Sequence, residues 1–407
     1  MNGCTTQTIG NVVIRAKTWN PLRGAKDEVF NYIDLSAVDQ NFKRIVGVRE
    51  IANGDAPSRA RQIVRYGDVL VSTVRPNLNS VARVPAELDG ATASTGFCVL
   101  RPINKSIDGT YLFQWVKSSL FINVMVNRAT GASYPAVSDR IIFESQIPLP
   151  PLDDQIRIAH LLGKIETLIA RRKENLLQLD DLLKSVFLEM FGDPIVNPKK
   201  FPVRKLSEFY SSQKDGTKCG PFGSALKKEE LVKAGVPVWN MDNIDPSGRM
   251  ILPFRMWITE KKYRQLTSYS VLDGDIVISR AGTVGKMCVA KTDAGHGIIS
   301  TNLIRLRLGS KLLPLYVVSL MMYCKGRVGR LKTGPDGTFT HMNTGVLDIL
   351  EFPYPPIALQ NQFAAIVEKV EGIKTRYQQN LTELENLYGV VSRKAFKGEL
   401  DLSRVQG

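Results

Sequence analysis

PPLDDQIRIAHLLGKIETLIARRKENLLQLDDLLKSVFLEMFG, residues 150–192, is the stretch around which the chain is organised. A second copy, PPIALQNQFAAIVEKVEGIKTRYQQNLTELENLYGVVSRKAF, occupies residues 355–396 and aligns with the first without a gap. Paired residues such as Gln155 and Gln360 are always 205 positions apart. A constant offset over this length indicates one element that is used twice.

Both copies are predicted to be long helices. Their apolar residues, Leu176 and Leu381 among them, recur at alternating steps of four and three, the spacing of a coiled-coil seam. Each copy follows a Pro-Pro pair, which cannot continue a helix backwards, and residues 153–191 would span roughly 58 Å at 1.5 Å per residue. We expect a spacer or a dimerisation arm, and the alternative is an ordinary buried helix of a bundle. The predicted seam, in which Asn175 and Asn380 fix the register, comprises Ile158, Leu162, Ile165, Ile169, Asn175, Leu179, Leu183, Val186, Phe363, Val367, Val370, Asn380, Leu384, Tyr388 and Val391.

The positive charge of the chain lies outside these helices. The formal net charge is +15, yet the two helices together carry eleven basic and eleven acidic residues. A basic excess confined to the two remaining segments favours a polyanionic partner, most often nucleic acid. The alternative is a high pI without a specific partner.

Length and composition predict a cytoplasmic protein of two or three domains. The chain has 407 residues, of which 43% are hydrophobic, and no apolar run approaches the ~18 residues of a membrane helix. The N-terminus has no signal-peptide core, and the five cysteines form no CxxC pair. We therefore expect neither a disulfide framework nor a zinc site.

The two segments outside the helices follow one plan. Residues 1–150 alternate short β-branched runs with Gly, Pro, Asn and Asp clusters, and a helix is predicted at about residues 109–128. YGDVLVST (residues 66–73) is matched by DGDIVISR (residues 273–280) at an offset of 207, and STGFCVLRP by STNLIRLRL. The loops differ between the copies. A shared framework with different loops suggests two modules that perform one kind of task on different targets.

No catalytic motif is visible. RAGTVGKM, residues 280–287, lacks the spacing of a phosphate loop, and no GxGxxG follows a strand. The carboxylate pattern of Mg²⁺-dependent nucleases and the Asn/Asp-Pro-Pro-Tyr/Phe motif of amino-methyltransferases are also absent, and the three histidines are far apart in the sequence. The chain is predicted to be a binding protein and not an enzyme, with no metal site.

Several of these segments resemble the specificity subunits of type I restriction–modification systems. IPLPPLDDQIRIAHLL, FLEMFGDP, FPYPPIALQNQFAAIV and RKAFKGEL resemble the helical repeats of that family, and GPFGSALK and GDIVISRAGTVGK resemble its target-recognition domains. The resemblance covers nearly the whole chain. It implies an α+β fold with a pseudo-twofold internal repeat, in which two recognition domains of mixed α/β structure with curved sheets are joined by an antiparallel coiled coil. The expected domains are 1–150 and 194–351 for recognition, and 151–193 and 352–407 for the helices.

The resemblance also implies a function. Each recognition domain would read one half of an asymmetric, bipartite site in double-stranded DNA, and the helices would set the spacer and dock two modification (methyltransferase) subunits. Restriction and translocase subunits would join through the complex. S-adenosylmethionine, ATP and Mg²⁺ would belong to these partners, and no membrane would be involved. The alternatives are a stand-alone DNA-binding protein with two modules and a coiled-coil adaptor without DNA specificity.

Candidate DNA contacts are placed in loops. Arg and Asn can contact guanine and adenine edges through two hydrogen bonds, which favours Arg75, Asn77 and Arg280. The first-domain candidates are Arg59, Arg61, Arg75, Asn77, Arg128, Ser133 and Tyr134. The second-domain candidates are Phe222, Ser224, Lys227, Arg280, Thr283, Lys286, Lys332, Thr338, Phe339 and His341.

Overall fold

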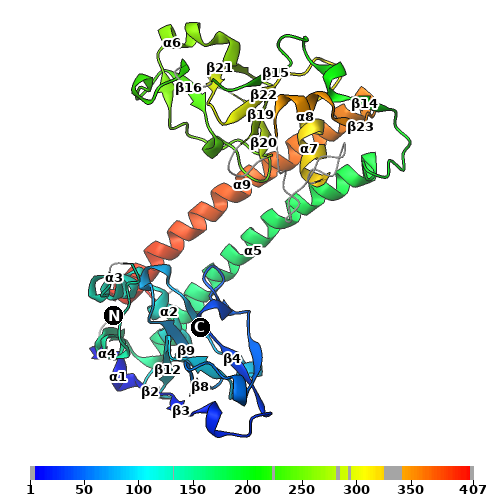
Figure 1. The fold of residues 1–407 in the computed structure, drawn as a ribbon. Helices are drawn as coiled ribbons and strands as arrows, with labels where there is room; N and C mark the ends of the chain where they lie inside the picture. The colour runs from blue at the N-terminus through cyan, green and yellow to red at the C-terminus, as the bar shows by residue number, and fades with distance from the viewer. Residues whose placement is uncertain are drawn as a thin grey trace. The chain divides into compact units, whose positions relative to one another are not determined.

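The chain forms two compact units (Figure 1). The computed structural model describes residues 5–131, 133–221, 225–280, 285–291, 295–324 and 342–403. Unit 1 comprises Met1–Asn175 and Tyr377–Gly407, and unit 2 comprises Leu176–Arg376. Each unit therefore combines an α/β body with a part of each long helix.

Two helices of 40 residues each, α5 (Leu152–Phe191) and α9 (Ile357–Phe396), correspond to the repeated stretch. They are green and orange-red in Figure 1. A glycine in the left-handed region lies within two residues of each helix end, Gly192 with φ 76° after α5 and Gly398 with φ 74° after α9. Glycine adopts this conformation at little cost, which lets the chain leave the helix. The prediction of two long helices is confirmed.

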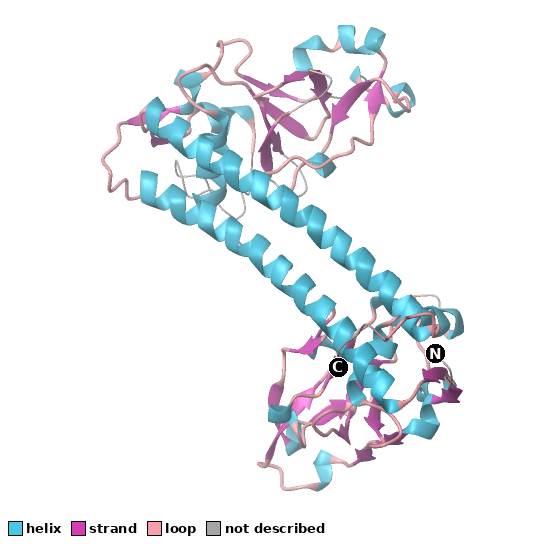
Figure 2. Ribbon diagram, turned by 180° about the vertical axis from the view of Figure 1, so that it is seen from behind, coloured by secondary structure: helices cyan, strands magenta, loops and turns pink. Residues whose placement is uncertain are grey.

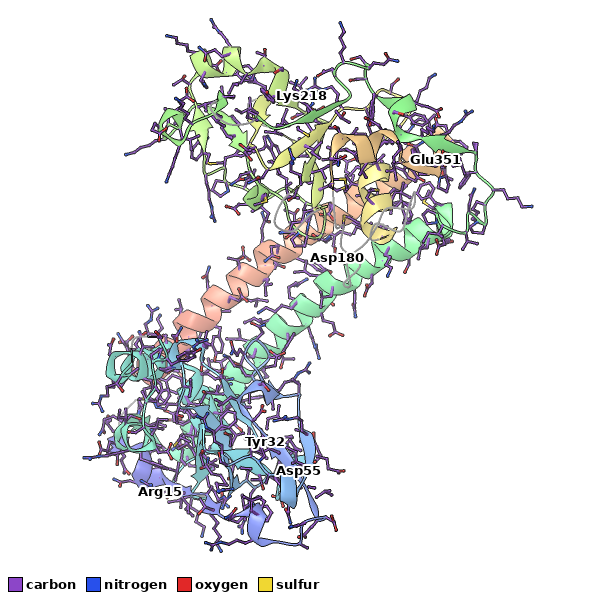
Figure 3. All side chains as sticks on the ribbon, viewed as in Figure 1. Arg15, Tyr32, Asp55, Asp180, Lys218 and Glu351 are labelled. Carbon is purple, nitrogen blue, oxygen red and sulfur yellow. The ribbon has the colours of Figure 1, made fainter. Side chains whose placement is uncertain are left out.

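The two helices run in opposite directions where they pack together. In unit 2 the Phe363 ring, early in α9, lies 5.3 Å from the Phe191 ring at the end of α5. Further along, Lys374 Nζ lies 2.5 Å from Asp180 Oδ1, which is labelled in Figure 3. Residue numbers therefore rise along one helix as they fall along the other. The predicted antiparallel pair is confirmed.

The body of unit 1 contains two sheets. One is antiparallel with the strand order β10-β9-β12-β2, and the other has the order β3-β8-β11-β4-β7 with one parallel pair, β11 with β4. A separate pair joins β1 to β13. The strands are β1 (Thr5–Thr8), β2 (Val13–Arg15), β3 (Lys17–Thr18), β4 (Val29–Ile33), β7 (Arg49–Ala52), β8 (Ala60–Ile63), β9 (Val69–Ser72), β10 (Val81–Arg83), β11 (Thr92–Ser94), β12 (Phe97–Pro102) and β13 (Gln146–Leu149), with a small hairpin of β5 (Val38–Asp39) and β6 (Arg44–Ile45).

The body of unit 2 repeats this topology. The order β20-β19-β22-β15 corresponds to β10-β9-β12-β2, and β18-β21-β16-β17 corresponds to β8-β11-β4-β7, with the parallel pair at the equivalent place. Figure 2 shows these strands in magenta. They are β14 (Val203–Lys205), β15 (Thr217–Cys219), β16 (Val236–Trp239), β17 (Trp257–Ile258), β18 (Ser270–Leu272), β19 (Ile276–Ser279), β20 (Met287–Val289), β21 (His296–Ile299), β22 (Leu303–Leu306) and β23 (Glu351–Pro353).

Short helices complete each body, and one of them differs from the sequence expectation. The single helix predicted at residues 109–128 is two helices, α2 (Gly109–Lys117) and α3 (Ser119–Arg128). Ser118 separates them because its backbone is extended and its hydroxyl accepts the Phe121 amide, which caps α3. The other short helices are α1 (Ile9–Val12), α4 (Asp139–Glu144), α6 (Glu260–Gln265), α7 (Pro314–Cys324) and α8 (Thr344–Asp348).

A buried glutamine anchors the start of each long helix to its body. In unit 1 Gln155 Oε1 accepts the Asp108 amide, and its Nε2 donates to the Pro150 carbonyl, both at 2.9 Å. In unit 2 Gln360 makes the equivalent bonds to Leu313 and Pro355, also at 2.9 Å. The two side chains are 1% and 0% exposed. The repeat thus extends to buried hydrogen bonds.

An aromatic contact closes each unit at the other helix end. The Phe396 ring, at the end of α9, lies 5.4 Å from Tyr111 in unit 1, and the Phe191 ring, at the end of α5, lies 4.9 Å from Tyr316 in unit 2. Each tyrosine donates its hydroxyl proton to a carbonyl of the strand before the helix, at Pro148 and Pro353. Each body therefore packs on the start of one helix and the end of the other.

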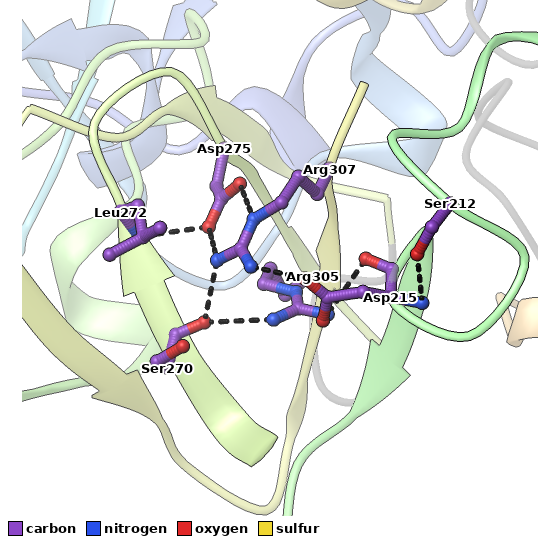
Figure 4. Close-up of polar contacts among 7 residues, drawn as sticks. All are labelled: Ser212, Asp215, Ser270, Leu272, Asp275, Arg305 and Arg307. Atoms are coloured by element: carbon purple, nitrogen blue, oxygen red, sulfur yellow. Dashed lines mark hydrogen bonds and ion pairs between the residues drawn. The ribbon is translucent and has the colours of Figure 1, made fainter. Parts of the chain in front are cut away.

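Buried ion pairs also recur, with one elaboration in unit 2. Arg101 pairs with Asp68 at 2.8 Å in unit 1, and Arg307 pairs with Asp275 at 2.7 Å in unit 2. Figure 4 shows that unit 2 adds Arg305, which is 1% exposed and bonds to the backbone carbonyl of Ser270 and to Asp215. This network fixes the strand β18 and the loop before β15 to the sheet core.

Candidate nucleic-acid interface

The hairpin between β9 and β10 in unit 1 carries a constrained turn. Arg75 and Asn79 have left-handed backbones, with φ of 49° and 48°, on either side of the 3-10 turn η4 (Pro76–Leu78). This conformation costs a residue with a side chain about 1–2 kcal/mol. Neighbouring contacts stabilise it, including the 2.7 Å bond from the Arg75 amide to the Pro135 carbonyl. The result is a fixed turn, residues 75–79, with Arg75 and Asn77 exposed.

A second loop lies against this turn. Val74 and Thr130 both bridge to Ala136, so the loop that follows α3 is held beside the hairpin. The Arg75 guanidinium lies 4.6 Å from the centre of the Tyr134 ring, and the Tyr134 side chain is 69% exposed. A cation over an aromatic ring is attracted to it. The structure therefore brings Arg75, Asn77 and Tyr134 to one surface, together with the exposed Ser133.

The other candidates of unit 1 lie in different settings. Arg59 is exposed, and its carbonyl accepts the Thr95 amide at 2.8 Å. Arg128 is exposed at the end of α3. Arg61, which was expected in a loop, lies instead on strand β8 and is half-buried, because its guanidinium donates to the Ala60 carbonyl at 2.8 Å. The loop expectation is wrong for Arg61.

Unit 2 places two candidates at the equivalent hairpin. Arg280 directly follows β19, Lys286 directly precedes β20, and both are half-buried. The Ser279 amide donates to the Lys286 carbonyl at 2.7 Å, which closes the mouth of the hairpin. Lys227 is exposed before the 3-10 turn at Lys228–Glu230, and its amide donates to the Glu230 carboxylate. Both hairpins therefore carry cations, although at different positions, because the alignment of YGDVLVST with DGDIVISR places Thr73, and not Arg75, opposite Arg280.

Seven of the unit 2 candidates lie outside the described residues. They are Phe222, Ser224, Thr283, Lys332, Thr338, Phe339 and His341.

Lys43 is a polar residue beside the 75–79 turn that sequence reasoning missed. Its Nζ donates to the Asn79 carbonyl at 2.5 Å, from the β5–β6 hairpin. Burial, and then the charge of Lys117, lowers the pKa of Lys43 to about 8. The only sequence signal was the basic pair Lys43-Arg44, because a contact between residues 36 positions apart has no local pattern.

About half of the predicted seam is buried, and most of the remainder is half-buried. Asn380 differs from the expectation, because it is exposed and its amide group donates to Glu383 at 3.4 Å. The neighbouring Leu381, 6% exposed, is the buried residue at this level. Ile158, Leu162, Ile165, Leu183, Phe363, Val367 and Val370 are buried, whereas Ile169, Asn175, Leu179, Val186, Leu384, Tyr388 and Val391 are half-buried.

Charged and aromatic pairs, more than asparagines, join the helices in their middle parts. In unit 1 the Arg172 guanidinium lies 4.0 Å from the centre of the Tyr377 ring, and Lys173 Nζ lies 2.9 Å from Glu385 Oε1. In unit 2 the side chain of Lys374 is only 2% exposed and pairs with two carboxylates. A buried ammonium that left these partners would be costly, so the pairs oppose a shift of register.

Two further observations concern membranes and metals. No helix in the described part of the chain is long and apolar enough to span a membrane. Among the described residues, no group of three or more His, Cys, Asp or Glu side chains could hold a metal ion.

Comparison with known proteins points to one family. Residues 63–179 match the family described as "Type I restriction modification DNA specificity domain". The specificity subunit of the type I restriction enzyme MjaVIII from Methanocaldococcus jannaschii is 24% identical over 66% of this chain and 65% of its own length, so the match spans slightly less than two thirds of that relative. The EcoKI specificity subunit from Escherichia coli is also 24% identical, over 75% of this chain and 68% of its own length.

Solved structures agree. A chain from a structure titled for complex assembly and conformational transition of the type I restriction–modification system is 25% identical, has a TM-score of 0.63, and covers 98% of this chain and 99% of its own. The specificity subunit from M. genitalium shares the fold at 15% identity, with a TM-score of 0.54 over 97% of this chain and 96% of its own. The resemblance to type I specificity subunits is confirmed.

Proposed function

We propose that this relative of the type I restriction–modification specificity subunits is the DNA-reading subunit of such an enzyme. Residues 1–150 would read one half of a bipartite site and residues 194–351 the other. The helical segments, residues 151–193 and 352–407, would fix the unspecified spacer between the halves. This assignment explains the basic excess outside the helices, because Lys and Arg would neutralise DNA phosphates while selected side chains read base edges.

One observation carries the proposal. The two units share a strand order, a buried glutamine anchor and an equivalent hairpin, yet the two hairpins carry their cations at different positions. The 75–79 turn presents Arg75 and Asn77, whereas the corresponding hairpin of unit 2 is flanked by Arg280 and Lys286. Equivalent frames with different side chains would read two different half-sites. The target would therefore be asymmetric.

The repeat also supports two equivalent docking surfaces. Exposed apolar residues recur on the long helices at the same offset of 205: Leu168 is 49% exposed and Ile373 40%, and Leu182 is 46% exposed and Leu387 47%. Each unit would dock one modification subunit, and restriction subunits would join through that complex. Methyl transfer, ATP-driven translocation and cleavage would then belong to the partners, with their S-adenosylmethionine, ATP and Mg²⁺. This chain would act in the cytoplasm and contribute specificity without catalysis.

The test is to express the chain with its modification subunit and sequence the methylated adenines of the host DNA. We expect methylation at one bipartite, asymmetric sequence and a complex that holds two modification subunits for each copy of this chain. A stand-alone DNA-binding protein would bind DNA without this complex. A coiled-coil adaptor would show no steep decrease of DNA affinity with salt. The matches to known proteins favour neither alternative.

A domain exchange assigns the half-sites. Residues 195–351 would be replaced by the corresponding segment of another specificity subunit, and the methylated site sequenced again. We expect one half-site to change while the other half and the spacer stay the same. A change in both halves would contradict independent reading by the two domains.

A further inference from the structure

We propose that Lys43 is a positioning residue for DNA reading in unit 1, because it holds the 75–79 turn from one side while Lys117 and Glu166 connect that turn to the helix pair. The inference rests on the proposed function for its DNA readout. Its structural part stands on the contacts of unit 1 alone.

The contacts form one continuous chain. Lys43 Nζ donates to the Asn79 carbonyl at 2.5 Å, and Asn79 Nδ2 donates to the Lys117 carbonyl at 3.2 Å. Lys117 Nζ lies 2.5 Å from Glu166 Oε1 on α5. Gln114 then donates to Glu166 Oε2 at 2.8 Å and accepts the hydroxyl proton of Tyr388, on α9, at 2.9 Å. The turn is thus connected to both long helices by side chains of α2.

The hold is needed because the turn is strained. Arg75 and Asn79 are both left-handed, and so is Lys43 with φ 53°. Residues with side chains rarely persist in this region unless their surroundings determine it. On one side the Arg75 amide is held by the Pro135 carbonyl. The turn also packs against α3. On the Asn79 side, among the described residues outside the turn, only Lys43 and Lys117 form hydrogen bonds with Asn79, so losing Lys43 should loosen the end nearest to Asn77.

The strength of this hold depends on the charge of Lys43. A hydrogen bond from an ammonium is roughly twice as strong as one from a neutral donor. The groups that face Lys43 across a groove of about 480 Å³ are Lys117, Glu166, Lys173, Glu385 and Tyr388, and Asp39 lies in its own hairpin. Glu166 and Glu385 are already paired with Lys117 and Lys173. Lys43 therefore lies near cations and is bonded to a carbonyl, not to a carboxylate.

The charge has a clear pH range. The pKa of Lys43, about 8, is lower than the 10.5 of a free lysine, so the ammonium is largely present at pH 7 and largely lost at pH 9. Because burial disfavours the ammonium, its loss over this interval removes a burial cost together with the charge, and the neutral amine can still donate to the Asn79 carbonyl. DNA phosphates do not titrate there, and burial raises the pKa of Cys98 and of Cys288, so neither thiol should ionise in this range. Burial also lowers the pKa of Lys117, so the role of Lys43 is tested by substitution at pH 7.

Three variants test the proposal. Lys43→Met removes the ammonium and keeps the stem, and Lys43→Arg keeps a charge at every pH of the experiment. Lys105→Met is the matched control, because Lys105 is an exposed lysine of unit 1 that is also left-handed, with φ 75°. The first measurement is amide exchange across the 75–79 turn at pH 7. The second is the affinity for DNA with single-base changes in each half-site, at pH 7.

We expect the amides of the 75–79 turn to exchange about ten-fold faster in Lys43→Met than in wild type. The variant should also lose about ten-fold of its discrimination between bases in the unit 1 half-site, because it has lost one charge-assisted hydrogen bond. Discrimination in the other half-site should stay unchanged. Lys43→Arg and Lys105→Met should behave as wild type at pH 7.

The proposal is overturned if Lys43→Met exchanges or discriminates like wild type, or if Lys43→Arg is as impaired as Lys43→Met. If wild type shows no sequence-specific DNA binding, the proposed function fails, and exchange in the turn still decides whether Lys43 holds it.

Discussion

Equivalent substitutions at the two glutamine anchors test whether corresponding residues of the internal repeat contribute equally to the free energy of unfolding. Gln155→Leu removes both hydrogen bonds that join the start of α5 to its body, and Gln360→Leu does the same for α9. The volume changes little, so the main cost is an amide and a carbonyl left without partners. Unsatisfied buried groups cost about 1–3 kcal/mol each.

We expect each variant to lose about 3 kcal/mol of unfolding free energy. Each unit has about 200 residues, a size at which 1 kcal/mol corresponds to about 2–4 °C in Tm. Gln155→Leu should therefore lower the transition that includes unit 1 by about 6–12 °C, and Gln360→Leu should lower the transition that includes unit 2 by a similar amount. Because the four bonds are all 2.9 Å, the two losses should agree within about 1 kcal/mol.

Scanning calorimetry measures both variants beside a control. Gln178→Leu changes an exposed glutamine of the same α5 helix and should leave Tm within about 2 °C of wild type. The reasoning is refuted if Gln155→Leu is no more destabilising than Gln178→Leu. It is also refuted if one glutamine substitution lowers the unfolding free energy by about 3 kcal/mol and the equivalent substitution does not change it.

Three further predictions follow from the helices, the 75–79 turn and the unit 2 ion network. Inserting seven residues into each helix, near Arg172 and Tyr377, keeps the seam in phase and adds about 10 Å to each helix. The spacer in the DNA site should then grow by about three base pairs while both half-sites stay the same. Sequencing of methylated DNA measures both, and an altered half-site would contradict the prediction. Arg75→Ala should cost about 1–3 kcal/mol of discrimination at one base pair of the unit 1 half-site, measured by competition with single-base variants, and an equal loss at every sequence would indicate a phosphate contact instead. Burial raises the pKa of Asp215, but hydrogen bonds and charge from Arg305 help to hold it below its ordinary 3.8. This carboxylate therefore contributes stability that is present above that pH and is lost as the pH falls below it. Urea denaturation should show a steeper loss of stability in acid for wild type than for Asp215→Asn, and parallel curves would contradict the assignment.

The sequence predicted those parts of the fold that depend on local periodicity. Steps of four and three give the buried positions Ile158, Leu162, Phe363 and Val367, because the same spacing places side chains on one face of a helix. Asn380 was misplaced because alignment with Asn175 says only that two positions correspond. One residue later, Leu381 offers more apolar surface, and burying it leaves the amide group of Asn380 in water.

The interface was predicted less completely, for a different physical reason. Arg75 and Tyr134 come from loops 59 positions apart, and each could be selected for its chemistry. Their mutual contact, and the bond from Lys43 to Asn79, depend on left-handed backbones at Arg75 and Lys43, whose residue types do not favour that conformation, and at Asn79, whose type tolerates it. Non-glycine residues adopt this conformation only when distant contacts stabilise it. Such contacts lie beyond the range of sequence patterns.

The offsets within the repeat follow from what each element tolerates. In the helices the offset is 205 at every paired position, because inserting one residue turns all later side chains by about 100° and moves the seam away from its partner. The antiparallel pairs Lys173 with Glu385 and Lys374 with Asp180 would lose their partners at the same time. The sheets have no such constraint, because an extra residue in a surface loop leaves the strands paired. The helices should therefore keep one length for one spacer, while the loops remain free to differ between the two half-sites.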